Sequence, residues 1–375
     1  MKKDRKEKGN VPNLRRFPNL RFPEFEGEWE TVKIKDCLNC HSSTLMESAV
    51  IEKSGIYPVY GATGIITYTP NYEIDNDAIL IIKDGSSVGK VQYAKNKYSV
   101  IGTLNYLTPK ENVNLKYLYY YLQTFNFDKY KVGSGIPHIY FKDYGNEYIY
   151  CPLIEEQTKT AYLLQLIDDR ISTQSQIVEE LETLMKGLSK KLFSQQLRFK
   201  NDNGNDYPDW KNKNMGDIAT ITTGSSNRED SVLDGKYIFF DRSQDIRTSH
   251  IYLFDKEAII VPGEGQKFIP QYYIGKFDLH QRAYAIFDFV DINGKFLYYY
   301  ILNEDRYLQS QAVGSTVKSL RLPMFQSMPI KTPYLQEQTN IANFLSAIDE
   351  KIETEKQILR KYTEQKKYLL ANMFI

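Results

Sequence analysis

Two stretches of the chain carry apolar residues at alternating steps of three and four, which is the spacing of a coiled-coil seam. Each stretch follows a proline, Pro152 or Pro333, and has a glutamate in its first turn, where the helix dipole favours negative charge. Both are therefore predicted to be long helices, and we expect them to pack against each other in antiparallel fashion. The apolar seam positions are Leu164, Ile167, Ile171, Val178, Leu181, Met185 and Leu188 in the first helix, and Leu345, Ile348, Ile352, Leu359 and Leu369 in the second.

The two helical stretches are also copies of one another. Residues 152–177 and 333–358 align without a gap and are identical at 12 of 26 positions, including Glu156-Gln157 and Glu337-Gln338. Weaker matches extend backwards into the preceding segments, at offsets that drift by a few residues. The chain is therefore a duplication, in which a globular segment precedes each helix and loops of different length vary on one scaffold.

Strands and short helices are predicted in both globular segments. In the first, apolar runs punctuated by glycine predict strands within 56–69, 77–94 and 98–108, and a helix over 114–131. In the second, the corresponding strands are predicted near 236–241, 257–262 and 281–290, and the helix near 293–309.

The predicted fold class is α+β, with two similar domains joined by two long antiparallel coiled-coil helices. The internal duplication predicts pseudo-two-fold symmetry. The expected division is a flexible arm over 1–20, a first domain over 21–152, a first spacer helix over 153–199, a second domain over 200–333 and a second spacer helix over 334–375.

Composition favours a reducing compartment and gives no sign of nucleic-acid binding. There are 3 cysteines, too few for a disulfide framework, and no apolar run reaches the roughly 18 residues of a membrane span, so we expect a cytoplasmic protein. The net charge is +1 at pH 7, and residues 21–152 and 200–333 carry −2 and −1. A self-sufficient DNA-binding domain carries a basic excess. If the protein binds DNA, either local patches do so or a partner clamps the duplex.

Several short motifs accompany the duplication. Both helices open with Pro-x-x-x-Glu-Gln and continue to Ile-Asp, and further motifs lie at 56–65, 84–90 and 261–265. Together they resemble the specificity subunits of type I restriction–modification enzymes, over essentially the whole chain. The resemblance implies two target recognition domains, each recognising one half of a bipartite double-stranded DNA site. It also implies that the helices set the spacing between the half-sites and dock the modification subunits.

The same resemblance implies a non-catalytic subunit. Its partners would be two modification (methyltransferase) subunits and the restriction (motor and nuclease) subunits, with no membrane contact. S-adenosylmethionine would bind to the modification subunit, and this chain would hold no cofactor. In keeping with that expectation, the sequence contains neither the Pro-Pro motif of adenine methyltransferases nor a glycine-rich phosphate-binding loop.

We expect DNA contacts from polar residues in the glycine-containing loops and in the turns before the long helices. Arginine suits guanine, and asparagine or glutamine suits adenine. The candidates in the first domain are Thr63, Lys83, Ser86, Ser87, Lys90, Asn105, Ser134 and His138. Those in the second are Arg242, Arg247, Lys267, Gln281, Arg282, Ser315, Thr316 and Lys318.

The residues alone leave other functions open. Duplicated domains on a coiled-coil spacer also suit a scaffold that binds proteins rather than DNA. A methyltransferase or nuclease fused to its own recognition domain is disfavoured by the missing motifs. The run Cys37-Leu-Asn-Cys40-His41 has the spacing of a c-type haem attachment site or of part of a zinc site. Haem attachment requires export and zinc requires a further ligand, so we expect no metal.

Overall fold

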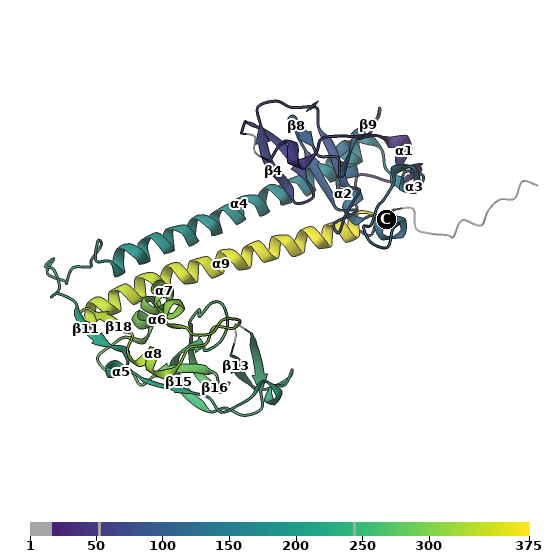
Figure 1. The fold of residues 1–375 in the computed structure, drawn as a ribbon. Coiled ribbons are helices and arrows are strands. Elements are labelled where there is room, and N and C mark those ends of the chain that lie inside the picture. The colour runs from purple at the N-terminus through teal and green to yellow at the C-terminus, as the bar shows by residue number, and fades with distance from the viewer. Residues whose placement is uncertain (1–16, 52–53, 243–244) are drawn as a thin grey trace, which may run out of the picture. The chain divides into compact units, whose positions relative to one another are not determined.

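The computed structural model describes residues 17–51, 54–242 and 245–375. The chain divides into two compact units, one formed by Met1–Gln174 with Ile358–Ile375 and the other by Ser175–Gln357. The long helices α4 (Ile154–Phe193) and α9 (Leu335–Met373) are each continuous (Figure 1). Each unit therefore contains a globular domain, the start of the helix that follows it and the end of the other long helix.

The first globular domain contains two four-stranded sheets, ordered β2-β9-β6-β7 and β4-β3-β8-β5. Strands β3 and β8 are parallel, and the other pairs are antiparallel. A separate pair, β1 and β10, leads into α4. The elements are β1 (Glu30–Lys33), α1 (Ile34–Cys37), β2 (Leu38–Ser42), β3 (Tyr57–Gly61), β4 (Gly64–Thr69), β5 (Ile74–Asp75), β6 (Ala78–Ile82), β7 (Val91–Ala94), β8 (Lys97–Val100), β9 (Leu104–Pro109), α2 (Leu115–Thr124), α3 (Phe141–Tyr144) and β10 (Tyr148–Cys151), with 3₁₀ turns at Glu47–Ala49 and Phe127–Tyr130.

The second globular domain combines the same arrangement into one six-stranded sheet, ordered β12-β17-β15-β16-β13-β14. Strands β13 and β16 form its parallel pair, and β11 with β18 leads into α9. The elements are β11 (Lys211–Asn214), α5 (Met215–Ile218), β12 (Thr220–Thr223), β13 (Tyr237–Phe240), β14 (Ile246–Ser249), β15 (Phe254–Pro262), β16 (Gln271–Leu279), β17 (Ala283–Phe287), α6 (Gly294–Asn303), α7 (Asp305–Gln311), α8 (Leu322–Gln326) and β18 (Pro329–Thr332), with a 3₁₀ turn at Arg228–Asp230.

The two domains differ where one long strand is interrupted. Strand β16 is continuous over nine residues, whereas its counterpart in the first domain is split into β7 and β8. The split occurs at Asn96, which has a positive φ of 61° and donates its backbone N–H to Asp77 Oδ1 at 3.1 Å. Asparagine tolerates this left-handed conformation better than most residues. The break at Asn96 lies where the single sheet of the second domain corresponds to two sheets in the first.

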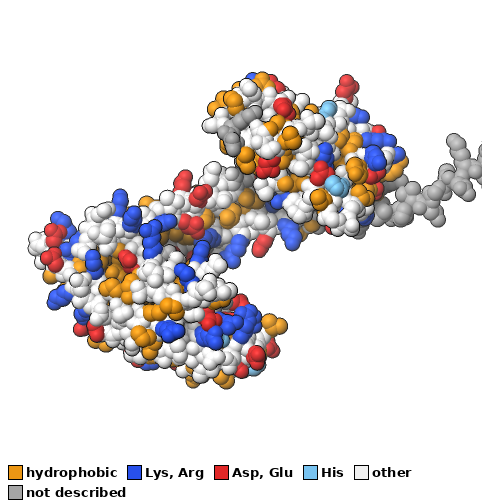
Figure 2. Space-filling model, in the orientation of Figure 1, with side chains coloured by type: hydrophobic (Ala, Val, Ile, Leu, Met, Phe, Trp, Pro, Cys, Tyr) orange, Lys and Arg blue, Asp and Glu red, His pale blue; other side chains and the backbone are white. Residues whose placement is uncertain are grey.

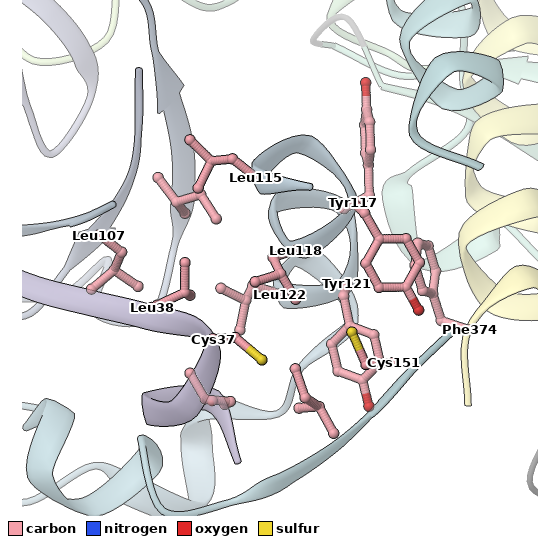
Figure 3. Packing of buried hydrophobic residues seen from close by; sticks show 14 of the residues in the cluster. Cys37, Leu38, Leu107, Leu115, Tyr117, Leu118, Tyr121, Leu122, Cys151 and Phe374 are labelled. Atoms are coloured by element: carbon pink, nitrogen blue, oxygen red, sulfur yellow. The ribbon is translucent and has the colours of Figure 1, made fainter. Parts of the chain in front are cut away.

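The core of each unit includes the end of a long helix. In the first unit, the Phe374 ring lies beside Tyr117 and Tyr121 of α2, at centroid distances of 5.4 and 5.6 Å (Figure 3). In the second, Phe193 at the end of α4 packs in the same way on Phe296 and Tyr300 of α6, at 5.7 and 5.5 Å. Each domain is therefore completed by a phenylalanine from the helix that follows the other domain.

The predicted α+β class with two similar domains and two long helices is confirmed, but some helix bounds are wrong. The helix predicted over 114–131 ends at Thr124, because the Asn126 side chain accepts from Asp128 N and opens a 3₁₀ turn. The helix predicted near 293–309 breaks at Glu304 into α6 and α7. Most of the arm expected over 1–20 lies outside the described residues.

Candidate nucleic-acid interface

The first turn of each long helix contains a buried glutamate that binds to the globular domain before it. In the first unit, Glu156 is 2% exposed and accepts from Arg21 Nε and Nη2, both at 2.7 Å, and from Trp29 Nε1 at 3.2 Å. In the second unit, Glu337 is 0% exposed and accepts from Arg198 Nε and Nη2 at 3.0 and 2.8 Å. Trp210 Nε1 donates to it at 3.2 Å, completing the same set of contacts. The negative charge is thus compensated by a two-point arginine contact in both units.

The glutamine that follows each glutamate joins the long helix to the short one beside it. Gln157 Oε1 accepts from Asn114 N at 2.9 Å, and Gln338 Oε1 accepts from Asn293 N at 2.8 Å. Asn114 and Asn293 are the N-caps of α2 and α6. The repeated Glu-Gln pair therefore fixes the angle between two helices in each unit, which is a structural role.

Within each unit the two long helices contact each other through their seam positions. All twelve apolar seam residues are buried or half-buried. In the first unit, Asp168 pairs with Lys366 at 2.7 Å, and Arg170 Nη1 donates to the Tyr362 hydroxyl at 3.3 Å, so the helix segments run antiparallel. In the second unit, Lys356 pairs with Glu182 at 2.8 Å.

Two of the predicted DNA-contact loops of the first unit lie side by side. Ile139 N donates to Lys83 O at 3.0 Å, and Gly85 N donates to Pro137 O at 3.0 Å. The ring of His138 is hydrogen-bonded to Asp84 through Nδ1 and Oδ1, 2.7 Å apart. The structure therefore brings together the residues of the loop after β6 and those of the loop before α3, namely Lys83, Ser86, Ser87, Lys90, Ser134 and His138.

The second unit joins its corresponding loops with the same backbone contacts. Leu320 N donates to Gly263 O at 2.9 Å, and Gly265 N donates to Lys318 O at 3.0 Å. Glu264 N also donates to Arg242 O at 3.3 Å, which adds the loop after β13. Arg282 lies in the turn before β17, and its side chain contacts Glu264. The exposed candidates Arg242, Arg282, Ser315, Thr316 and Lys318 therefore share one face of loops.

Comparison with known proteins identifies this arrangement. A family model described as the type I restriction modification DNA specificity domain matches residues 26–183 and again residues 207–363. The chain belongs to this family. The type I restriction enzyme MjaVIII specificity subunit of Methanocaldococcus jannaschii is 27% identical over 96% of this chain and 94% of that protein. The EcoDI specificity subunit of Escherichia coli is 28% identical over 42% of this chain and 36% of its own length.

Solved structures show the same fold. The crystal structure of a type I restriction-modification S subunit from M. genitalium superimposes with a TM-score of 0.72 at 18% identity, covering 96% of this chain and 99% of the other. A structure from a study of assembly and conformational transition of the type I R-M system superimposes with a TM-score of 0.50 at 13% identity, over 91% and 96% of the two chains. The chain is therefore a DNA-specificity component of a restriction–modification system, and family membership confirms the predicted non-catalytic role.

Not every predicted contact residue belongs to the specificity-domain loops. Asn105 does not lie in an exposed loop: it is 5% exposed in β9, and its Oδ1 accepts from Ser42 Oγ of the adjacent strand β2 at 2.9 Å. Its side chain joins two strands of the sheet. Thr63 is exposed in the β3–β4 turn, which is linked to β7 because Gln92 Nε2 donates to Gly61 O at 2.9 Å.

Three candidates of the second specificity domain lie beside the main loop face. Arg247 is on the edge strand β14 and donates to Asp245 Oδ2 at 3.1 Å and to Ser231 Oγ at 3.0 Å. Gln281 Nε2 donates to Asn227 Oδ1 at 2.5 Å. Lys267 is exposed in the loop between β15 and β16.

Sequence reasoning missed two charged residues of the second domain. Arg228 contacts Asp241 at 2.6 Å and Asp245 at 2.9 Å, and so compensates a fully buried carboxylate. Glu264 contacts both Arg242 and Arg282. Glu264 could have been found from the sequence, because it occupies the same place in its loop as Asp84 does in the first domain. Nothing local in the sequence indicated the partners of Arg228.

The buried ring of His280 is hydrogen-bonded to the turn that carries Arg282. Its ring is 4% exposed, and Nδ1 accepts from Arg282 N at 3.0 Å, so the ring proton resides on Nε2. Burial lowers the pKa of His280, opposed by the nearby Asp241 carboxylate, which lies 3.9 Å from Nε2. The neutral imidazole is therefore the form that fits this turn.

Charge is mixed over the domain surfaces. On the face shown in Figure 2, basic and acidic side chains are interspersed over both units and form no continuous basic band. This agrees with the net charge of +1. This face is therefore poorly suited to neutralise many DNA phosphates by itself.

The Cys37–His41 run does not form a metal site. Among residues 17–51, 54–242 and 245–375, no group of three His, Cys, Asp or Glu side chains could hold a metal ion. His41 stacks on Tyr106 and lies 2.9 Å from Thr108 Oγ1 through Nε2. Burial raises the pKa of the Cys40 thiol to about 11, which disfavours the thiolate that a metal requires. Within the described part of the chain, no helix is both long and apolar enough to cross a membrane.

Proposed function

We propose that the two units recognise the two halves of one bipartite DNA site, and that the long helices set the distance between the halves and dock the modification subunits. One observation carries the proposal. The same Arg–Trp–Glu anchor supports both domains, through Glu156 in one and Glu337 in the other, whereas the loops on the two frames differ in their charged residues. A repeated frame with different loops suits two different targets better than one target bound twice.

We assign methyl transfer and cleavage to partner chains. Two modification subunits would bind S-adenosylmethionine and methylate adenine, and restriction subunits would cleave DNA, all in the cytoplasm. The interspersed charge of the surface supports this division, because a partner that clamps the phosphates removes the need for a basic band here. The protein-interaction scaffold considered from sequence alone is not favoured, since both family matches are to DNA specificity domains.

The proposal is tested by mapping methylated adenines in the genome of cells that express this chain with its modification subunit. We expect a bipartite motif with a modified adenine in each half and a fixed number of unspecified bases between them. Cells with the modification subunit alone serve as the control and should lack the motif. A continuous motif, or no motif that depends on this chain, would contradict the proposal.

A further inference from the structure

Arginine is distributed very unequally between the two specificity domains. Residues 22–169, which include every strand of the first globular domain, contain no arginine. Residues 200–333 contain Arg228, Arg242, Arg247, Arg282, Arg306 and Arg321. Lysine does not follow this pattern, since it occurs in both domains. Because arginine presents a planar fork that pairs with two acceptors at once and lysine does not, the domains differ in recognition chemistry as well as in loop length.

Two of these arginines are held together by one carboxylate. Glu264 Oε1 accepts from Arg282 Nη1 at 2.5 Å, and its Oε2 lies 3.5 Å from Arg242 Nη1. The Glu264 side chain is only 17% exposed, whereas the Arg242 and Arg282 side chains are 44% and 57% exposed. Each guanidinium has five N–H donors, and these contacts occupy Nη1 of each. Both guanidiniums are therefore held by a largely buried carboxylate, while their side chains stay partly exposed.

The backbone beneath the arginines is fixed as well. Arg282 N donates to His280 Nδ1 at 3.0 Å, and Arg242 N donates to Asp241 Oδ1 at 2.7 Å. The Arg282 carbonyl lies so close to Gly263 that a Cβ atom there would be 2.1 Å from its oxygen. Only glycine fits at position 263, so the loop of Glu264 and the turn of Arg282 are locked together. A positioned pair of forks loses less entropy on binding than two free side chains.

The first domain shares backbone hydrogen bonds with this site but carries different side chains. His280 N donates to Phe240 O, and Ile101 N donates to Tyr60 O, both at 3.0 Å. These two hydrogen bonds match Phe240 with Tyr60 and His280 with Ile101. Two residues further along each segment, Arg242 therefore matches Ala62, and Arg282 matches Thr103. The bridges Asp84–His138 and Glu264–Ser319 likewise match Asp84 with Glu264. In the first domain, the carboxylate at this place thus faces His138 instead of two arginines.

We infer that Arg242 and Arg282, oriented by Glu264, recognise guanine in the half-site bound by the second domain, and that the first domain recognises its half-site without arginine. The inference rests on the proposed function. A guanidinium fork matches guanine O6 and N7 in the major groove. A phosphate is a poorer partner for this cluster, because the Glu264 carboxylate reduces its charge and repels a phosphate. Glu264 thus favours base recognition over backbone contact.

The test uses the full chain in complex with its modification subunit and a pool of DNA duplexes with randomised positions. The variant Arg242→Ala/Arg282→Thr places the residues of the first domain on the frame of the second. Arg282→Lys keeps the charge but removes the fork. Arg306→Thr, at an exposed position on α7, removes one positive charge from the same domain and serves as the control.

We expect the wild-type complex to select guanine at one or more positions of one half-site. The double variant should reduce that preference roughly five- to hundred-fold, as expected for the loss of two-point base contacts, and leave the other half-site unchanged. Arg282→Lys should weaken the same preference without changing the salt dependence of binding, and Arg306→Thr should change neither half-site.

Several outcomes would overturn the inference while leaving the proposed function intact. These are a guanine preference that survives in the double variant, an equal loss of affinity for all sequences, and a preference that Arg282→Lys retains in full. The second outcome would assign the arginines to phosphates. Failure of the wild-type complex to select any bipartite site would instead overturn the proposed function.

Discussion

The two units use one frame to present two surfaces. Glu156 and Glu337 accept hydrogen bonds from an arginine and a tryptophan in the same geometry, with distances that agree within a few tenths of an ångström. The loops above these anchors share backbone hydrogen bonds but not side chains, since Asp84 faces His138 whereas Glu264 faces two arginines. Backbone contacts tolerate almost any side chain. A duplicated specificity domain can therefore change its recognition surface without disturbing the frame.

The largest expected effect is the loss of an interlocking phenylalanine. Phe374→Ala should destabilise the first unit, and Phe193→Ala the second, each by about 4 kcal/mol, because a buried aromatic ring is replaced by a cavity. Urea unfolding gives the size of the loss, and hydrogen exchange of the α2 and α6 amides shows which unit has opened. Tyr368→Ala, at a site 60% exposed, is the control. A loss confined to one of the two variants would show that the units are not built alike.

Removal of an anchor carboxylate should cost slightly less. Glu156→Ala or Glu337→Ala leaves an arginine, 17% or 20% exposed, without its partner, and we expect a loss of about 3 kcal/mol in either case. The same unfolding assay applies, with the exposed Glu350→Ala as control. If either anchor variant matched the wild type, the anchor would not be what holds that domain to its helix.

A smaller difference should appear on acidification. Burial lowers the pKa of His280, so its folded-state pKa lies below the ordinary value of 6.5. Between these two pKa values the unfolded chain binds more protons, so stability falls with decreasing pH by at most about 1.4 kcal/mol per pH unit. The first domain has Ile101 at the matched position and lacks this contribution. His280→Gln should flatten the dependence of the second unit below pH 6.5; an unchanged slope would exclude His280 as its source.

The last expected effect is kinetic and separates the units. All 3 cysteines, Cys37, Cys40 and Cys151, lie in the first domain, so the rate of thiol labelling reports the opening of that unit alone. Cys37 and Cys151 are buried, and Cys40 is half-buried with a raised pKa. Native protein should therefore react slowly with a thiol reagent. Phe374→Ala should accelerate labelling at least tenfold, and Phe193→Ala by less than about twofold. Equal acceleration by both variants would mean that the units open together.

The helices and anchors could be predicted from sequence because their determinants are local and repeated. A seam of three- and four-residue steps specifies a helix face, and an identical Glu-Gln pair at two helix starts indicates a shared structural role. The break between β7 and β8 falls between the predicted strand ranges 77–94 and 98–108, but the resulting division into two sheets could not be predicted, because strand pairing across a domain leaves no local pattern. Strand β16 was missed since Gly275 and Lys276 interrupt its apolar pattern.

The candidate contacts were harder to predict, because exposure depends on which face of a strand a residue occupies. Asn105 is polar and close to a glycine loop, yet it points toward Ser42. Arg228 was missed because its partners, Asp241 and Asp245, follow 13 and 17 residues later in the sequence. Contacts between residues this far apart produce no periodic pattern in the sequence from which they could be predicted.

The most direct test of the account exchanges one surface and keeps the frame. Strand pairs β1–β10 and β11–β18 match residue for residue, with Glu30 opposite Cys151 and Lys211 opposite Thr332. A chain in which residues 211–332 replace residues 30–151 would carry the second recognition surface twice. Mapping of methylated adenines with its modification subunit should give a motif in which the second half-site occurs twice and the first is absent. Retention of the wild-type motif would contradict the claim that each domain recognises its own half-site.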